Sequence, residues 1–87
     1  MDFEFDPAKS RSNQAKHGIG FEEAKQLWDD EKRVEAPAPS EKEERFLLIG
    51  MIEDKHWIAV VTYRTDRIRI ISVRRARKVE IENYLGR

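Results

Sequence analysis

Residues 45–74 read RFLLIGMIEDKHWIAVVTYRTDRIRIISVR, and this stretch decides the fold. It contains three runs rich in isoleucine, valine, leucine and aromatic residues, a composition typical of β-strands. The runs are Arg45–Ile52, His56–Arg64 and Arg67–Arg74. The connections between them, residues 53–55 and 65–66, are short enough for hairpin turns, so the sequence predicts an antiparallel sheet.

Two helices are predicted before these strands. Asp6 followed by Pro7 is a strong helix start. Gly18 can take the left-handed conformation that ends a helix, so the first helix is expected to run from Pro7 to about His17. Apolar residues at i, i+3, i+6 and i+7 then predict an amphipathic helix ending near residues 29–30. These apolar residues are Phe21, Ala24, Leu27 and Trp28.

The remaining segments complete an α+β order. Residues 3–5 alternate like a short strand, and a brief strand is expected at Lys32–Glu35. The proline-rich segment Ala36–Ser40 reads as a loop. A helical pattern returns from Ala76 to Leu85. The expected fold is a curled antiparallel sheet with two N-terminal helices and a C-terminal helix, the helices lying on one face.

Composition predicts one small domain over residues 1–87. Hydrophobic residues make up 39% of the chain, enough for one modest core, and there is no cysteine to form disulfides. The first six residues carry acids where a signal peptide would carry bases. No apolar run approaches the roughly 20 residues that span a bilayer. A cytoplasmic protein without membrane contact is therefore expected.

Charge is unevenly distributed, although the formal net charge is zero. Residues 1–54 hold 8 Lys and Arg against 14 Asp and Glu, whereas residues 55–87 hold 9 against 3. A basic region suits phosphates and an acidic region suits a basic protein partner. The alternative is two solvated surfaces that differ in charge without a partner.

Polar residues of the first predicted helix form a first candidate site. Lys9, Asn13, Lys16 and His17 lie at i, i+4, i+7 and i+8, which places them along one side of a helix. Lysine and asparagine can hold phosphate oxygens, and a histidine can transfer a proton near neutral pH. The alternative is an ordinary solvated helix face that ends in a capping histidine.

Arginines of the predicted sheet form a second candidate site. Arg64, Arg69 and one of Arg74 and Arg75 could line one surface, because adjacent strand residues face opposite ways. The planar guanidinium binds phosphate through two parallel hydrogen bonds and keeps its charge. The alternative is that these arginines pair with the acidic half of the chain. Tyr84 is either a core anchor or a polar group at a site.

Several other chemistries have no support in the sequence. The four glycines are scattered and form no phosphate-binding loop. The two histidines, His17 and His56, are 39 residues apart without cysteine partners, so no metal or cofactor site is expected. His56 lies beside a hairpin turn and is expected at the surface. No serine lies in a nucleophile elbow.

Three blocks of the chain together resemble the BrnT family of toxins. The first block holds Phe3–Lys9, Asn13, Lys16–Ile19 and Phe21–Ala24, and the second is Glu44–Gly50. The third holds Thr62–Arg64, Ile68–Ala76, Glu80 and Tyr84. The blocks occur in the family's order over nearly the whole chain. The turn at residues 65–66 departs from the family pattern because it is shorter and lacks glycine.

The resemblance implies a fold related to RelE-type ribonucleases and arrest of translation by RNA cleavage. It also implies a BrnA-like ribbon-helix-helix antitoxin, through which the complex contacts operator DNA. The polar positions that match the family are Lys9, Asn13, Lys16, His17, Arg45, Arg64, Arg74, Arg75, Glu80 and Tyr84.

The expected chemistry is metal-independent cleavage by the neighbouring 2′-hydroxyl of RNA. Arg64 and Arg74 are expected to stabilise charge, and His17 to transfer a proton, with Tyr84 or Glu80 as substitutes. One alternative is a nucleic-acid-binding module without catalysis, and another is a regulatory module that docks an antitoxin. The residues expected to bind RNA are Lys9, Asn13, Lys16, Arg45, Arg69 and Arg75.

Overall fold

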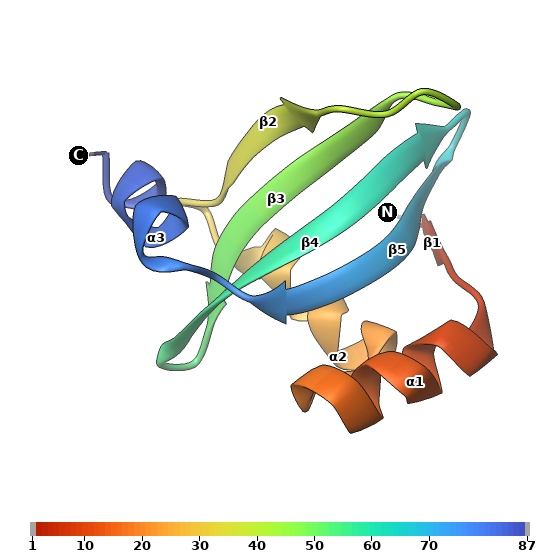
Figure 1. Ribbon diagram of the computed structural model, residues 1–87, viewed down its shortest axis with the longest axis horizontal. Helices are drawn as coiled ribbons and strands as arrows, with labels where there is room; N and C mark the ends of the chain where they lie inside the picture. The colour runs from red at the N-terminus through yellow and green to blue at the C-terminus, as the bar shows by residue number, and fades with distance from the viewer. Residues whose placement is uncertain (1, 87) are drawn as a thin grey trace.

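The computed structural model describes residues 2–86 and has an α+β fold built on one sheet, as the sequence predicts (Figure 1). Strands β3 to β5 and the N-terminal helix lie where their sequence patterns predict them. In chain order the elements are β1 (Asp2–Glu4), α1 (Pro7–His17), α2 (Phe21–Ala24), the 3₁₀ helix η1 (Lys25–Asp29), β2 (Val34–Ala38), β3 (Arg45–Ile52), β4 (Lys55–Arg64), β5 (Arg67–Arg75) and α3 (Lys78–Tyr84).

The sheet is mixed rather than fully antiparallel, so that part of the prediction is wrong. Within residues 2–86 its strand order is β1-β5-β4-β3-β2, and strands β2 to β5 pair antiparallel. Strand β1 pairs in parallel with the start of β5, with Phe3 opposite Ile68. Alternation in residues 3–5 identifies a strand but carries no information about its partner, which lies more than sixty residues away.

Two further boundaries differ from prediction. Strand β2 continues through Pro37, which was expected in a loop. Because β2 is an edge strand, Pro37 can join it without breaking a ladder inside the sheet. The second helix keeps α-helical geometry only over Phe21–Ala24 and continues as η1.

The hydrophobic core lies between one face of the sheet and the segment that holds α2 and η1. Its largest fully buried side chains include Phe21 and Leu27, which pack with Ala59 and Val73 of the central strands. A Cβ atom at Gly50 would lie 3.3 Å from Leu27 Cδ2, so this glycine lets η1 approach β3 closely. This packing fixes which face of the sheet is covered.

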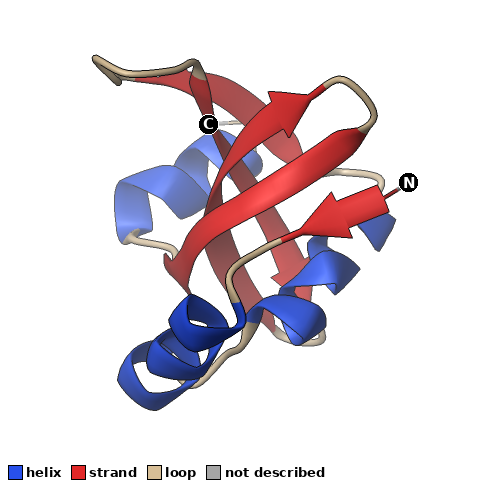
Figure 2. Ribbon diagram, turned by 90° about the vertical axis from the view of Figure 1, so that its right-hand side faces the viewer, coloured by secondary structure: helices blue, strands red, loops and turns tan. Residues whose placement is uncertain are grey.

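The other two helices border the opposite face, so the expectation that all helices lie on one face of the sheet is wrong. Figure 2 shows α3 on the side of the sheet away from α2 and η1, and Figure 1 shows α1 running beside β5. Helix α3 covers only one end of this face, so most of it is free of helices. Within residues 2–86, no helix has the length and apolar character needed to cross a membrane.

Candidate functional site

A row of arginines lies on the face of the sheet opposite the core. Trp57, Ala59 and Val61 of β4 point into the core, so the alternate residues of β4 point to the opposite face. Residues paired across strands share a face, and the register therefore places five arginines on this helix-poor side. We call this surface the arginine face; its arginines are Arg45, Arg64, Arg67, Arg69 and Arg74.

Glu4 of strand β1 joins two of these arginines. Its carboxylate oxygens lie 3.4 Å from Arg64 Nε and 3.4 Å from Arg69 Nη1. The side chain of Arg64 remains 54% exposed and that of Arg69 32%, so both guanidinium groups remain accessible to a phosphate. Sequence reasoning missed Glu4 because only the parallel pairing of β1 brings it here.

Arg74 is held by Glu80 at the opposite end of the arginine face. Its two terminal nitrogens lie 2.9 and 2.7 Å from the two carboxylate oxygens of Glu80. The same carboxylate accepts a hydrogen bond from the backbone N–H of Arg77 and so caps α3. The hydrogen bonds from Arg74 hold the pKa of Glu80 below its usual range. Glu80 therefore orients Arg74 and is itself ionised at neutral pH.

Tyr84 ties α3 to the segment after η1. Its hydroxyl donates to Asp30 Oδ2 over 2.7 Å, and Asp30 also accepts from the backbone N–H groups of Met51 and Lys32. Burial and the bond to Asp30 raise the pKa of Tyr84 to about 12, so the phenol stays protonated at neutral pH. Sequence reasoning missed Asp30, whose spacing to Lys32 is that of an Asx turn.

His56 lies beside Tyr84 and is not the surface residue that was expected. The two rings meet edge to face with their centroids 5.1 Å apart. Its Nε2 atom is buried and finds no hydrogen-bond partner within residues 2–86. Turn residues 53–55 are exposed, whereas His56 itself packs against Tyr84 of α3.

Three predicted residues of α1 line one groove beside β5. Lys9, Lys16 and His17 border a shallow cavity of about 240 Å³, together with Ser72 of β5. All three are exposed, and His17 lies in the last turn of α1, where the helix carbonyls favour a cation. The structure thus brings together the lysines and the histidine that the helical spacing places on one side.

Asn13 also borders this groove but has its side chain committed to the fold. Its amide nitrogen donates to the carbonyls of Ile19 and Val73 over 2.9 and 2.8 Å, and its oxygen accepts from the N–H of Val73 over 3.2 Å. Asn13 is only 8% exposed. It therefore pairs with the edge of β5 as a further strand would, and both amide hydrogens are used.

Arg75 points away from the arginine face. In the register of β4 and β5, Arg75 lies opposite Trp57, which points into the core. Its guanidinium carbon lies 5.5 Å from the centroid of the Trp57 ring. This is the geometry of a cation–π contact at the border of the core. The alternation expected for Arg74 and Arg75 is thus present, with Arg74 on the arginine face.

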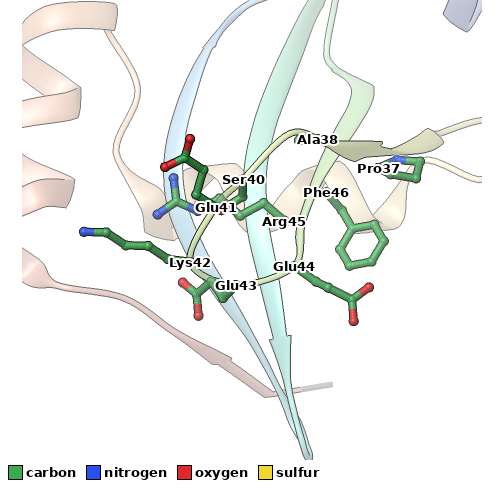
Figure 3. A pocket seen from close by; sticks show the side chains of 9 residues that line it. All are labelled: Pro37, Ala38, Ser40, Glu41, Lys42, Glu43, Glu44, Arg45 and Phe46. Carbon is green, nitrogen blue, oxygen red and sulfur yellow. The ribbon is translucent and has the colours of Figure 1, made fainter.

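The β2–β3 connection forms a further groove at the end of the arginine face. Its volume is about 420 Å³, and Figure 3 shows the side chains around it. Arg45 lines the groove, and its Nε atom is buried without a hydrogen-bond partner in the described part of the chain. The loop above it carries three glutamates and Lys42.

No group of three or more His, Cys, Asp or Glu side chains that could hold a metal occurs among residues 2–86.

An open sheet face lined with arginines, beside a groove with two lysines and a histidine, is a surface suited to a phosphate-bearing ligand. The family model of the ribonuclease toxin BrnT of type II toxin-antitoxin systems matches residues 5–80. The chain therefore belongs to this family, a class of ribonuclease toxins that have an antitoxin partner. A search of curated proteins finds no match.

Proposed function

We propose that this protein arrests translation by cleaving RNA without a metal ion, using the 2′-hydroxyl of the substrate as the nucleophile. The observation that supports this reaction is the arginine face, on which five guanidinium groups share one helix-poor side of the sheet. Guanidinium groups stabilise the charge that develops on a phosphate during such a reaction, and they need no ion to do so.

In the proposed reaction the 2′-oxygen attacks the adjacent phosphorus and the bond to the 5′-oxygen breaks. The products are a 2′,3′-cyclic phosphate and a free 5′-hydroxyl. Arg64 and Arg74 stabilise charge on the phosphate, and Arg45 and Arg69 bind the flanking backbone. Three of these side chains already have an anionic partner that orients the guanidinium group: Glu4 for Arg64 and Arg69, and Glu80 for Arg74.

His17 is our candidate for proton transfer. It is exposed in a groove whose lysines, Lys9 and Lys16, are suited to holding an RNA phosphate. Tyr84 and Glu80 are less suited to this role, because Tyr84 is bound to Asp30 and Glu80 is bound to Arg74. General acid–base catalysis contributes about 10²–10⁴-fold, so loss of His17 should leave a weak residual activity.

The finer features of the resemblance complete the proposal. The fold over residues 1–87 is a single domain related to RelE-type ribonucleases. The antitoxin is a BrnA-like ribbon-helix-helix protein, and operator DNA is contacted only through the complex. The toxin acts in the cytoplasm, where its RNA substrate is found.

The test compares wild type with Arg64→Ala and Arg75→Ala after induction without antitoxin, following growth and RNA integrity. Both variants lose one strand arginine, but only Arg64 lies on the arginine face. We expect wild type and Arg75→Ala to arrest growth and fragment RNA, and Arg64→Ala to lose about 10²-fold of its cleavage rate.

An equal loss of cleavage rate in both variants, or full activity of Arg64→Ala, would show that the arginine face takes no part in the reaction. If wild type binds RNA but leaves it whole, the protein is a binding module without catalysis. Thermal unfolding of each variant separates loss of activity from loss of folding.

A further inference from the structure

A third groove, which we call the aromatic groove, lies on the other side of the sheet, between β1 and the α2–η1 segment. It has a volume of about 410 Å³ and is lined by Phe3, Glu22, Lys25, Gln26, Trp28 and Asp29. None of these residues belongs to the arginine face or to the groove beside α1. We propose that the aromatic groove is a docking site for a basic segment of the antitoxin that carries an apolar side chain.

The groove already binds a cation of the chain itself. The ammonium of Lys25 lies 5.7 Å from the ring centroid of Phe3 and 5.8 Å from that of Phe5. It is also 2.8 Å from a carboxylate oxygen of Glu22. Aromatic faces and a carboxylate together attract a cation that brings an aliphatic stem with it. A lysine or arginine of a partner would meet the same combination at Trp28 and Asp29.

The aromatic wall supplies the apolar part of the site. Phe3 and Trp28 meet edge to face with their centroids 4.9 Å apart, and both are only half-buried. They pack against the core from outside, which fixes their rings in place. Rigid, partly exposed aromatic side chains are frequent anchors of protein interfaces, because covering them removes a large apolar area from water.

The charge around the groove selects a basic partner. Residues 21–31 contain five acidic residues and a single lysine. Asp29 is exposed, and no lysine, arginine or histidine of residues 2–86 lies within 4 Å of its carboxylate. The arginine face, on the opposite side of the sheet, repels a basic segment. Complementary charge therefore directs such a segment to the aromatic groove.

The occupant of this groove is the antitoxin, because the family to which this chain belongs has an antitoxin partner. The inference rests on that toxin–antitoxin assignment and not on the mechanism of RNA cleavage. It places an antitoxin contact on the acidic side of the toxin and leaves the arginine face outside this contact. A docking variant should therefore escape its antitoxin and stay toxic.

The test measures the Kd between the cognate antitoxin and the charge-reversal variant Glu22→Lys/Asp29→Lys. The matched control is Glu41→Lys/Glu43→Lys, which changes net charge equally on the β2–β3 loop. We expect the Kd of the groove variant to rise about tenfold or more, and that of the control to change less than about threefold. RNA cleavage without antitoxin should be the same for wild type and the groove variant.

Equal Kd values for wild type and the groove variant would overturn the proposal, as would equal weakening in the control. If the groove variant loses RNA cleavage instead of antitoxin binding, the groove belongs to the nuclease surface and the proposal is wrong. If the double variant does not fold, Asp29→Lys replaces it, because Asp29 is exposed and has no ion pair to lose. Because the readout is binding, it remains valid if wild type fails to cleave RNA.

Discussion

Replacing Asn13 with alanine should destabilise the protein far more than its place on a polar helix suggests. The substitution removes three hydrogen bonds, to the carbonyls of Ile19 and Val73 and from the N–H of Val73. The two Val73 groups lie along the part of β5 that β1 does not cover, because β1 pairs only with residues 67–69, and Ile19 lies in the connection between α1 and α2. Alanine would leave all three without their partner.

The expected loss follows from the cost of unsatisfied groups. A buried polar group without a partner costs about 1–3 kcal/mol. The groove beside α1 opens to solvent, so water can reach some of these groups. We therefore assign each group a cost of about 1 kcal/mol, the lower end of that range. The sum is a loss of about 3 kcal/mol in the free energy of unfolding, a large part of the 5–15 kcal/mol usual for a domain.

Urea denaturation of wild type, Asn13→Ala and Ser12→Ala measures this loss. Ser12 is the exposed neighbour on the same helix, and its replacement should change the free energy of unfolding by less than about 0.5 kcal/mol. A loss below about 1 kcal/mol for Asn13→Ala would refute the structural role. If such a stable variant also bound RNA weakly, Asn13 would return to the RNA-binding residues.

Two further predictions concern ionisable groups. Glu80→Gln should lower the free energy of unfolding at pH 7 by about 1.5 kcal/mol, because it replaces the carboxylate that binds Arg74. The pKa of Glu80 is lowered by folding, so this stabilisation is complete above pH ~4.3 and declines as pH falls further; a difference as large at pH 3 as at pH 7 would contradict the ion pair. Burial raises the pKa of Tyr84 to about 12 and also raises that of Tyr63, so absorbance at about 295 nm should show no tyrosinate step near pH 10 in the folded protein. The stability that these raised values contribute is complete below pH ~10 and is lost as pH rises, so a tyrosinate step at pH ~10 without unfolding would show that both phenols are free.

Local signals in the sequence were sufficient for much of the fold. The side chain of Asp6 accepts a hydrogen bond from the N–H of Ala8, and Gly18 has φ 79°, so both ends of α1 are set by residues next to them. Strands β3 to β5 have long apolar runs separated by short turns, which fix both their extent and their antiparallel pairing. Alternation also predicts that Arg74 and Arg75 face opposite ways.

Features that depend on distant residues could not be predicted. The partner of β1, the burial of Asn13 and the covering of His56 by α3 each require elements far apart in the chain. Spacing placed Asn13 with Lys9 and Lys16 on one side of α1, but it cannot say which member of such a set meets a free strand edge. Glu4 was missed for the same reason, since its role depends on β1 lying beside Arg69.

The most direct test of the central claim is cleavage of three matched oligonucleotides by the purified toxin in the presence of EDTA. One is RNA, one carries a 2′-O-methyl group at the cleavage position, and one is DNA of the same sequence. The account predicts that only the RNA is cut and that its new end is a 2′,3′-cyclic phosphate. Cleavage of the 2′-O-methyl or DNA strand, or loss of all cleavage in EDTA that added metal restores, would contradict it.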